Sequence, residues 1–231
     1  MKFYERRTKG EEEVVSYWLS IGDLMASILI IFILLFVFKT MEANSELKKK
    51  EDVIESLTSV KNKIIEKLRN EFKKENMKID IDPINGAIKI DEKILFNTNE
   101  YKIKPEGKDY LKKFIPQYTK ILIGDSEVNK EVSQIIIEGH TDDVGGYLFN
   151  MDLSQKRAFE VIKFIYEEME DFQFKEELKN YITANGRSKM RLIKDTNGNI
   201  DREKSRRVEF QFKLREDEAL KKIGESIKGG I

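Results

Sequence analysis

The chain has 231 residues with 42 basic and 42 acidic side chains, so its formal net charge at pH 7 is zero. This balance gives no sign of a nucleic-acid partner. The absence of cysteine excludes disulfides, thiolate catalysis and cysteine metal sites, and a single histidine, His140, excludes a multi-histidine metal site. These counts indicate no enzyme, no cofactor and no metal. The length suits one soluble domain with a membrane span and a connector.

Residues 1–15 are mixed in charge and too short to fold alone, so we interpret them as a tail on one side of a membrane. From Tyr17 to Phe38 the chain is mainly apolar with a single charge, Asp23, and about 20 apolar residues suffice to cross a bilayer core. The stretch is longer than the apolar region of a signal peptide, and no small-x-small cleavage site follows it. We predict a retained transmembrane helix over residues 16–40.

Asp23 is the one charged residue within this span. Ser16, Ser20, Asp23 and Ser27 fall on one helix face, and an aspartate facing lipid would cost about 2.5–3.5 kcal/mol. We therefore expect Asp23 to face protein or water and, with Ser20 and Ser27, to translocate an ion. The alternative is that Asp23, about 9 Å inside Tyr17, reaches the membrane interface, although an aspartate side chain is short for that.

The motif Trp18-x4-Asp23-Leu24-Met25, followed by an apolar run, resembles the membrane segment of the MotB-like B-subunits of ion-driven flagellar stators. In that family the aspartate carries the transported H⁺ or Na⁺. Basic residues flank the span on both sides, so charge does not set its orientation. The resemblance implies a bacterial inner-membrane protein that crosses once, with a cytoplasmic N-terminus and a periplasmic C-terminal domain.

Residues 41–77 carry apolar side chains at helical spacing among lysines and glutamates, with no proline or glycine. This pattern predicts an amphipathic helical connector. Its apolar stripe could pair with a second copy of the chain or pack on its own domain. In flagellar stators the corresponding segment acts as a plug, and this connector could do the same, although no motif indicates it.

Strand-like and helix-like segments alternate over residues 78–215, and a charged helix is expected over residues 216–231. A turn near Asn85-Gly86 separates two short strands, and Val132–Glu138 is a buried strand. Leu153-Ser154 is expected to open a helix with Ser154 as its N-cap. This alternation predicts an α/β sandwich with helices packed on one face of a mixed sheet.

Within this region, Gly139-His140-Thr141-Asp142 is followed at fixed spacings by Asn150, Leu153-Ser154 and Arg157-Ala158. With FNTNEYKIKPEG before it and Ser205-Arg206-Arg207-Val208-Glu209 after it, this pattern resembles the OmpA-like peptidoglycan-binding domain. Ser205 departs from the family's usual asparagine. The resemblance covers roughly residues 79–215 and implies the OmpA-like sandwich fold.

In that family the aspartate and the arginine of these motifs, here Asp142 and Arg157, grip the diaminopimelate of the peptidoglycan stem peptide. The pocket also uses the positions of Asn150, Thr98 and Asn99. Free-ended diaminopimelate carries an ammonium and a carboxylate on one carbon, so Arg157 could hold the carboxylate in a two-pronged fork while Asp142 accepts from the ammonium. The alternative is an ion pair between these two residues.

For the remaining motif residues we expect structural roles. His140 is expected to support the backbone, Gly139 and Gly145 to serve turn geometry, and Phe159 to belong to the core.

A membrane carboxylate at one end and a wall-binding domain at the other imply a stator. By resemblance it would act as a homodimer inside a pentameric ring of MotA/ExbB-like multi-span subunits. The phrases I-G-D-L-M-A-S and N-M-x-L-S-Q-x-R-A-F resemble the motor subunits of Zorya anti-phage defence more than flagellar ones. The alternatives are a flagellar stator for motility and a passive tether between membrane and wall.

Overall fold

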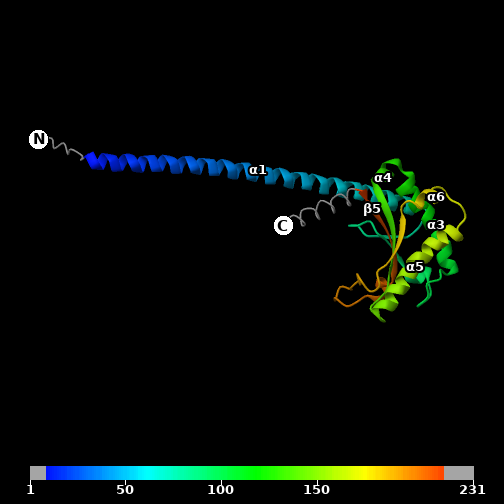
Figure 1. The fold of residues 1–231 in the computed structure, drawn as a ribbon. Coiled ribbons are helices and arrows are strands. Elements are labelled where there is room, and N and C mark those ends of the chain that lie inside the picture. The colour runs from blue at the N-terminus through cyan, green and yellow to red at the C-terminus, as the bar shows by residue number, and fades with distance from the viewer. Residues whose placement is uncertain (1–8, 216–231) are drawn as a thin grey trace. The chain divides into compact units, whose positions relative to one another are not determined.

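The computed structural model describes residues 9–215, without the side chains of residues 9–16, 50, 53, 54, 56 and 57. The start of the predicted tail and the predicted helix over residues 216–231 lie outside the described residues. The chain forms two compact units, Met1–Glu55 and Ser56–Ile231. Helix α1 (Lys9–Lys74) contributes to both units (Figure 1).

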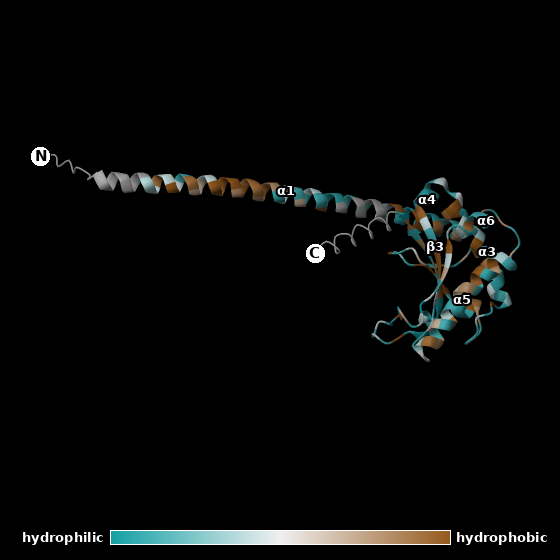
Figure 2. Cartoon of the chain, viewed as in Figure 1, coloured by the Kyte–Doolittle hydropathy of each residue, from teal (hydrophilic) through white to brown (hydrophobic). Residues whose placement is uncertain are grey.

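In the first unit, α1 carries the predicted apolar stretch, shown in brown in Figure 2. Within the described chain, Tyr17–Lys49 is the one helical segment long and apolar enough to cross a membrane. Its large apolar side chains are exposed all round the helix. A surface of this kind needs lipid or other protein around it. The predicted N-terminal apolar helix is therefore confirmed.

The second unit is built on a five-stranded sheet with the strand order β1-β2-β5-β3-β4. β3 and β4 pair in parallel, and the other neighbours pair antiparallel. This confirms the predicted mixed sheet. The strands are β1 (Asp80–Ile81), β2 (Ile88–Asp91), β3 (Val132–His140), β4 (Ile182–Gly186) and β5 (Arg207–Leu214).

Two helices, α3 and α5, lie on the same side of this sheet (Figure 1). Parallel strands need a long crossover, and α5 supplies it between β3 and β4. In the core between helices and sheet, the rings of Phe114 on α3 and Phe210 on β5 lie edge to face with their centres 4.8 Å apart. The helices of this unit are α2 (Glu92–Leu95), α3 (Pro105–Thr119), the π-helix η1 (Lys120–Gly124), α4 (Ser126–Glu131), α5 (Tyr147–Glu167), α6 (Lys175–Leu178) and α7 (Arg202–Ser205).

The C-terminal part of α1 belongs to the core of the second unit. Ile64, Ile65, Leu68 and Phe72 are buried there, and the Phe72 ring stacks on Phe114 at 5.1 Å. The predicted connector over residues 41–77 is thus divided, because its later apolar residues pack on their own domain. That part of the stripe is not available to a second copy of the chain. The domain core begins near residue 60 rather than at residue 78.

Helix α5 begins at Tyr147, six residues before the predicted start. Ser154 lies inside the helix, where its hydroxyl donates to the Met151 carbonyl and accepts from the Ser188 amide. Gly139 lies within β3 rather than in a turn, and a Cβ there would stand 2.1 Å from the Ser154 carbonyl oxygen. Glycine at this position lets α5 approach β3 closely. Phe159 is exposed, so its predicted core role was wrong.

Leu68→Ala is expected to destabilise the second unit by about 3 kcal/mol, because a fully buried leucine leaves a cavity when it is truncated. Hydrogen exchange of the β3 amides would measure this, since central strands open only with the whole domain. Glu66→Ala, on the exposed side of the same helix, is the matched control. Unchanged exchange in Leu68→Ala would contradict the assignment of this part of α1 to the domain.

Candidate functional site

A polar cleft of about 400 Å³ opens beside the end of β3. All five residues predicted to bind peptidoglycan line it, although they come from three separate segments. Thr98 and Asn99 lie in the loop after α2, Asp142 follows β3, and Asn150 and Arg157 are on α5. The structure therefore brings the predicted residues together in one place.

The loop between β3 and α5 is held by hydrogen bonds from two of these residues. The Val144 amide donates to Oδ1 of Asp142 at 3.0 Å, and Nδ2 of Asn150 donates to the Val144 carbonyl at 2.9 Å. Gly145 has a φ of +89°, which glycine adopts without strain. Asn150 and Arg157 are seven residues apart on α5, so they share one helix face. The loop and the helix together fix the orientation of Asp142 relative to Arg157.

Arg157 is only 2% exposed, and its guanidinium already pairs with a carboxylate of the protein. Its Nη2 donates to Oε1 of Glu92 at 2.9 Å, and its Nη1 lies 2.8 Å from Oε2 of the same carboxylate. Its Nε donates to the Glu100 carbonyl, and the guanidinium lies 5.2 Å from the centre of the Phe96 ring. Arg157 was expected to hold a ligand carboxylate with two nitrogens, and in the structure it makes this bidentate contact with Glu92 instead.

Asp142 pairs with a different arginine. Nη1 of Arg206 donates to Oδ2 of Asp142 at 2.6 Å, while Nε of Arg206 lies 3.7 Å from Oε2 of Glu92. The alternative of a direct Asp142–Arg157 ion pair is therefore not what the structure shows. Instead, Asp142, Arg206, Glu92 and Arg157 form a row of alternating charges along the cleft. Such a row can bind a ligand that carries both charges close together.

Sequence reasoning missed Glu92 and Arg206 as site residues. Arg206 lies in the motif around Ser205-Arg206-Arg207, which was matched to the family without a role for this arginine. Glu92 follows β2 directly, and no local pattern marks it. Ser205, in place of the usual asparagine, is fully buried and accepts a hydrogen bond from the Ile193 amide at 2.9 Å. It anchors the segment that leads to Arg206.

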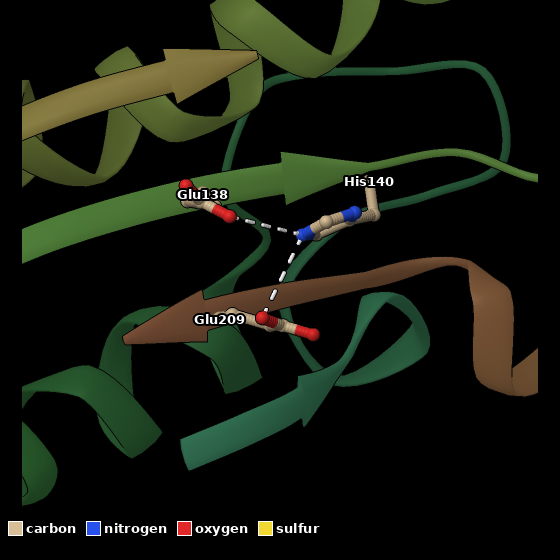
Figure 3. A group of neighbouring side chains, drawn as sticks. All are labelled: Glu138, His140 and Glu209. Carbon is tan, nitrogen blue, oxygen red and sulfur yellow. Dashed lines mark ion pairs between the residues drawn. The ribbon is translucent and has the colours of Figure 1, made fainter. Parts of the chain in front are cut away.

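His140 lies in a buried polar cluster with Glu138 and Glu209 (Figure 3). Its Nε2 is 3.6 Å from Oε2 of Glu138 and 3.8 Å from Oε2 of Glu209, and its Nδ1 faces the Met190 carbonyl at 3.4 Å. Burial raises the pKa of Glu138, but the nearby His140 and the hydrogen-bonded ion pair with Arg187 outweigh it and lower that pKa to about 2.

Potential metal-ligand atoms of these three residues lie within 4.8 Å of one another. However, Arg187 already pairs with Glu138, Arg207 pairs with Glu209, and Gln211 donates to both carboxylates. A divalent cation would add buried positive charge to glutamates that two arginines already neutralise. We interpret the cluster as a structural centre that holds the segment after β4 against the sheet.

Comparison with known proteins places this site in a family context. Residues 95–206 match the OmpA family, a range that includes all five predicted cleft residues and Arg206. Over 96% of its length the chain is 27% identical to the Zorya protein ZorB of Escherichia coli, of which it covers 98%. The chain is a homologue of ZorB. A second Escherichia coli ZorB is 25% identical over 68% of this chain and 63% of that protein.

Among solved structures, a putative MotB-like protein from Desulfovibrio vulgaris is similar with a TM-score of 0.49 and 17% identity. The similarity covers 69% of this chain and 94% of that one.

The similarity to ZorB extends over nearly the whole chain and so includes the apolar part of α1 with Asp23. Ser20, Asp23 and Ser27 lie on one face of α1, as their spacing predicts. The Ser27 hydroxyl donates to the backbone carbonyl of Asp23 at 2.8 Å, so this serine is bound to its own helix. The Asp23 side chain is exposed on the helix surface.

Proposed function

We propose that this chain is the B-subunit of an ion-driven rotary motor in the bacterial inner membrane, anchored to peptidoglycan and acting in Zorya-type anti-phage defence. The similarity to ZorB over 96% of the chain carries this proposal, because it joins the membrane helix and the OmpA-like domain in one protein. The proposed orientation is a single span with a cytoplasmic N-terminus and a periplasmic C-terminal domain.

At the wall end, the chemistry of the cleft supports peptidoglycan binding. The free end of diaminopimelate carries an ammonium and a carboxylate on one carbon. Asp142 and Glu92 offer carboxylates, and Arg206 and Arg157 offer guanidiniums, in one cleft. Charge-assisted hydrogen bonds to both groups would hold this zwitterion firmly. In this proposal, the ligand is the stem peptide of the cell wall.

At the membrane end, Asp23 supplies the ion-binding carboxylate, with Ser20 and Ser27 beside it. One elementary charge crossing the membrane potential releases about 2.3 kcal/mol per 100 mV, which is enough to bias a mechanical step. A single helix cannot enclose an ion path. We therefore propose that a dimer of this chain sits within a pentameric ring of MotA/ExbB-like subunits. The ring would step around the dimer as Asp23 binds and releases H⁺ or Na⁺.

The proposal is tested by co-purifying the chain with the membrane protein encoded beside its gene and counting subunits by native mass spectrometry. The expected result is a stable complex with two copies of this chain inside a larger ring. A chain that purifies without a multi-span partner, yet still sediments with peptidoglycan, would overturn the motor and leave a passive tether. Neighbouring flagellar genes in place of nuclease or helicase genes would favour motility over defence.

A further inference from the structure

A second cavity of the OmpA-like unit, of about 550 Å³, is lined by the last turns of α1, by η1 and by Phe174. It shares no described residue with the cleft beside the end of β3. Two features of its wall are rare in proteins. η1 is a π-helix, and Phe174 is a non-glycine residue with a φ of +68°. Backbone of both kinds is frequent at functional sites, which favours a binding role for this cavity.

The charges of the cavity are unevenly paired. Of the described residues that line it, three are lysines and two are carboxylates. Lys67 pairs with Asp125, whereas Lys74 and Lys120 both contact Glu71, with Nζ–O distances of 3.3 and 2.7 Å. The side chains of Lys74 and Lys120 are 73% and 58% exposed. Because they share one carboxylate, both can pair with a further acidic group.

Apolar surface lies beside these lysines. Ile121 of η1 and the Phe174 ring line the same cavity, and the ring covers Gly124 so closely that a Cβ there would collide with it. A partner that fits this wall therefore combines acidic side chains with an apolar face.

The described chain ends close to this cavity. Nε of Arg215 donates to the Lys130 carbonyl at 3.0 Å. Lys130 is in α4, and Asp125, the N-cap of the same helix, lines the cavity. These two residues are five positions apart, which corresponds to about 8 Å along a helix. Residues 216–231 follow Arg215 and would extend for about 24 Å as a helix, so they can reach the cavity.

The sequence of this segment complements the cavity wall. It begins with Glu216-Asp217-Glu218, and Leu220, Ile223 and Ile227 follow at the spacing of one helix face. Glu216 precedes Leu220 by four residues and so belongs to that face. A helix over these residues would be acidic at its start and apolar along one side.

We propose that residues 216–231 dock in this cavity of their own chain. The acidic start of the segment would pair with Lys74 and Lys120, and its apolar face would pack on Phe174. Docking there would join the end of β5 to the last turns of α1. This contact does not depend on the proposed motor function or on peptidoglycan binding.

The test uses introduced cysteines, because the full chain contains none of its own. Asn70→Cys places a thiol on the cavity wall and Ala219→Cys places one in the segment, and neither changes a charge. In the full chain in detergent with a mild oxidant, this pair should form a disulfide at least about tenfold faster than Asn62→Cys with Ala219→Cys. Asn62 is the matched control, since it is also an exposed asparagine of α1 but does not line the cavity.

A second comparison tests the charges. Lys74→Gln with Lys120→Gln should slow the disulfide between Asn70→Cys and Ala219→Cys by about threefold or more, since each exposed ion pair contributes a factor of about 1.5–5. Lys112→Gln with Lys113→Gln removes two exposed lysines of α3 outside the cavity and should leave the rate unchanged.

Equal disulfide rates at Asn70→Cys and Asn62→Cys would overturn the docking, and this comparison decides even if the lysine variants do not fold. Non-reducing gel electrophoresis separates a bond within one chain from a bond between two copies. A bond mainly between copies would overturn docking on the same chain. Equal slowing by both lysine pairs, or by neither, would overturn recognition through Lys74 and Lys120.

Discussion

Asp23→Asn is expected to reduce phage protection to the level of a strain lacking the gene. Asparagine keeps the size of the aspartate side chain but can neither bind and release a proton nor offer Na⁺ an anion. An aspartate within an apolar span is retained against an insertion cost of about 2.5–3.5 kcal/mol, which indicates a function that needs its charge. The effect is measured as the plating efficiency of phage on strains that express the Asp23→Asn variant or the wild type at equal abundance.

The control is the same substitution outside the apolar stretch, at Asp52 on α1, where the side chain is exposed. Asp52→Asn should protect as well as the wild type. Native mass spectrometry should show that the Asp23→Asn complex still assembles, which separates lost ion transfer from lost assembly. Full protection by Asp23→Asn would exclude an ion-driven mechanism through this residue.

Asp142→Asn is expected to weaken binding to purified peptidoglycan sacculi by about 100-fold, because one anion of the cleft is lost and Arg206 loses its charged partner. The hydrogen bond from the Val144 amide can persist to the asparagine oxygen, so the loop should keep its shape. Co-sedimentation of the full chain with sacculi over a range of protein concentrations gives the apparent affinity.

The adjacent residue provides the matched control for this prediction. Asp143 pairs with Arg202 and does not line the cleft, so Asp143→Asn should bind sacculi like the wild type. If both variants lose binding equally, the effect arises from the loop rather than from the cleft. If Asp142→Asn binds normally, Asp142 does not contact the wall.

The motif residues of the cleft could be predicted because their spacing is a property of the sequence. Asp142 lies in the loop after β3, and Asn150 and Arg157 lie on α5, so one continuous segment of the chain brings all three to the cleft. Glu92 and Arg206 could not be found in this way. They reach the cleft through the pairing of β2 with β5, and a tertiary contact of this kind leaves no local pattern.

The fold differs from the sequence prediction for a similar reason, because tertiary contacts decide between local patterns. Ser154 has the residue type of an N-cap, but α5 begins earlier, after Gly146, and uses that serine to contact the segment after β4. The stripe that includes Leu68 and Phe72 suits a second helix and a domain core equally well. The structure decides for the domain core, because Phe72 of this stripe stacks on Phe114 of α3.

The cleft also determines how a pulling force would enter the domain. Asp142 lies two residues beyond the end of β3, and Arg206 directly precedes β5, at the same end of a strand pair that runs from His140↔Arg207 to Val132↔Leu214. Tension from a held ligand would therefore run lengthwise along both strands. Because both strands would be pulled in the same direction, their shared hydrogen bonds would not be sheared against each other, and the load would pass through the hydrogen bonds to the strands on either side, β2 and β4.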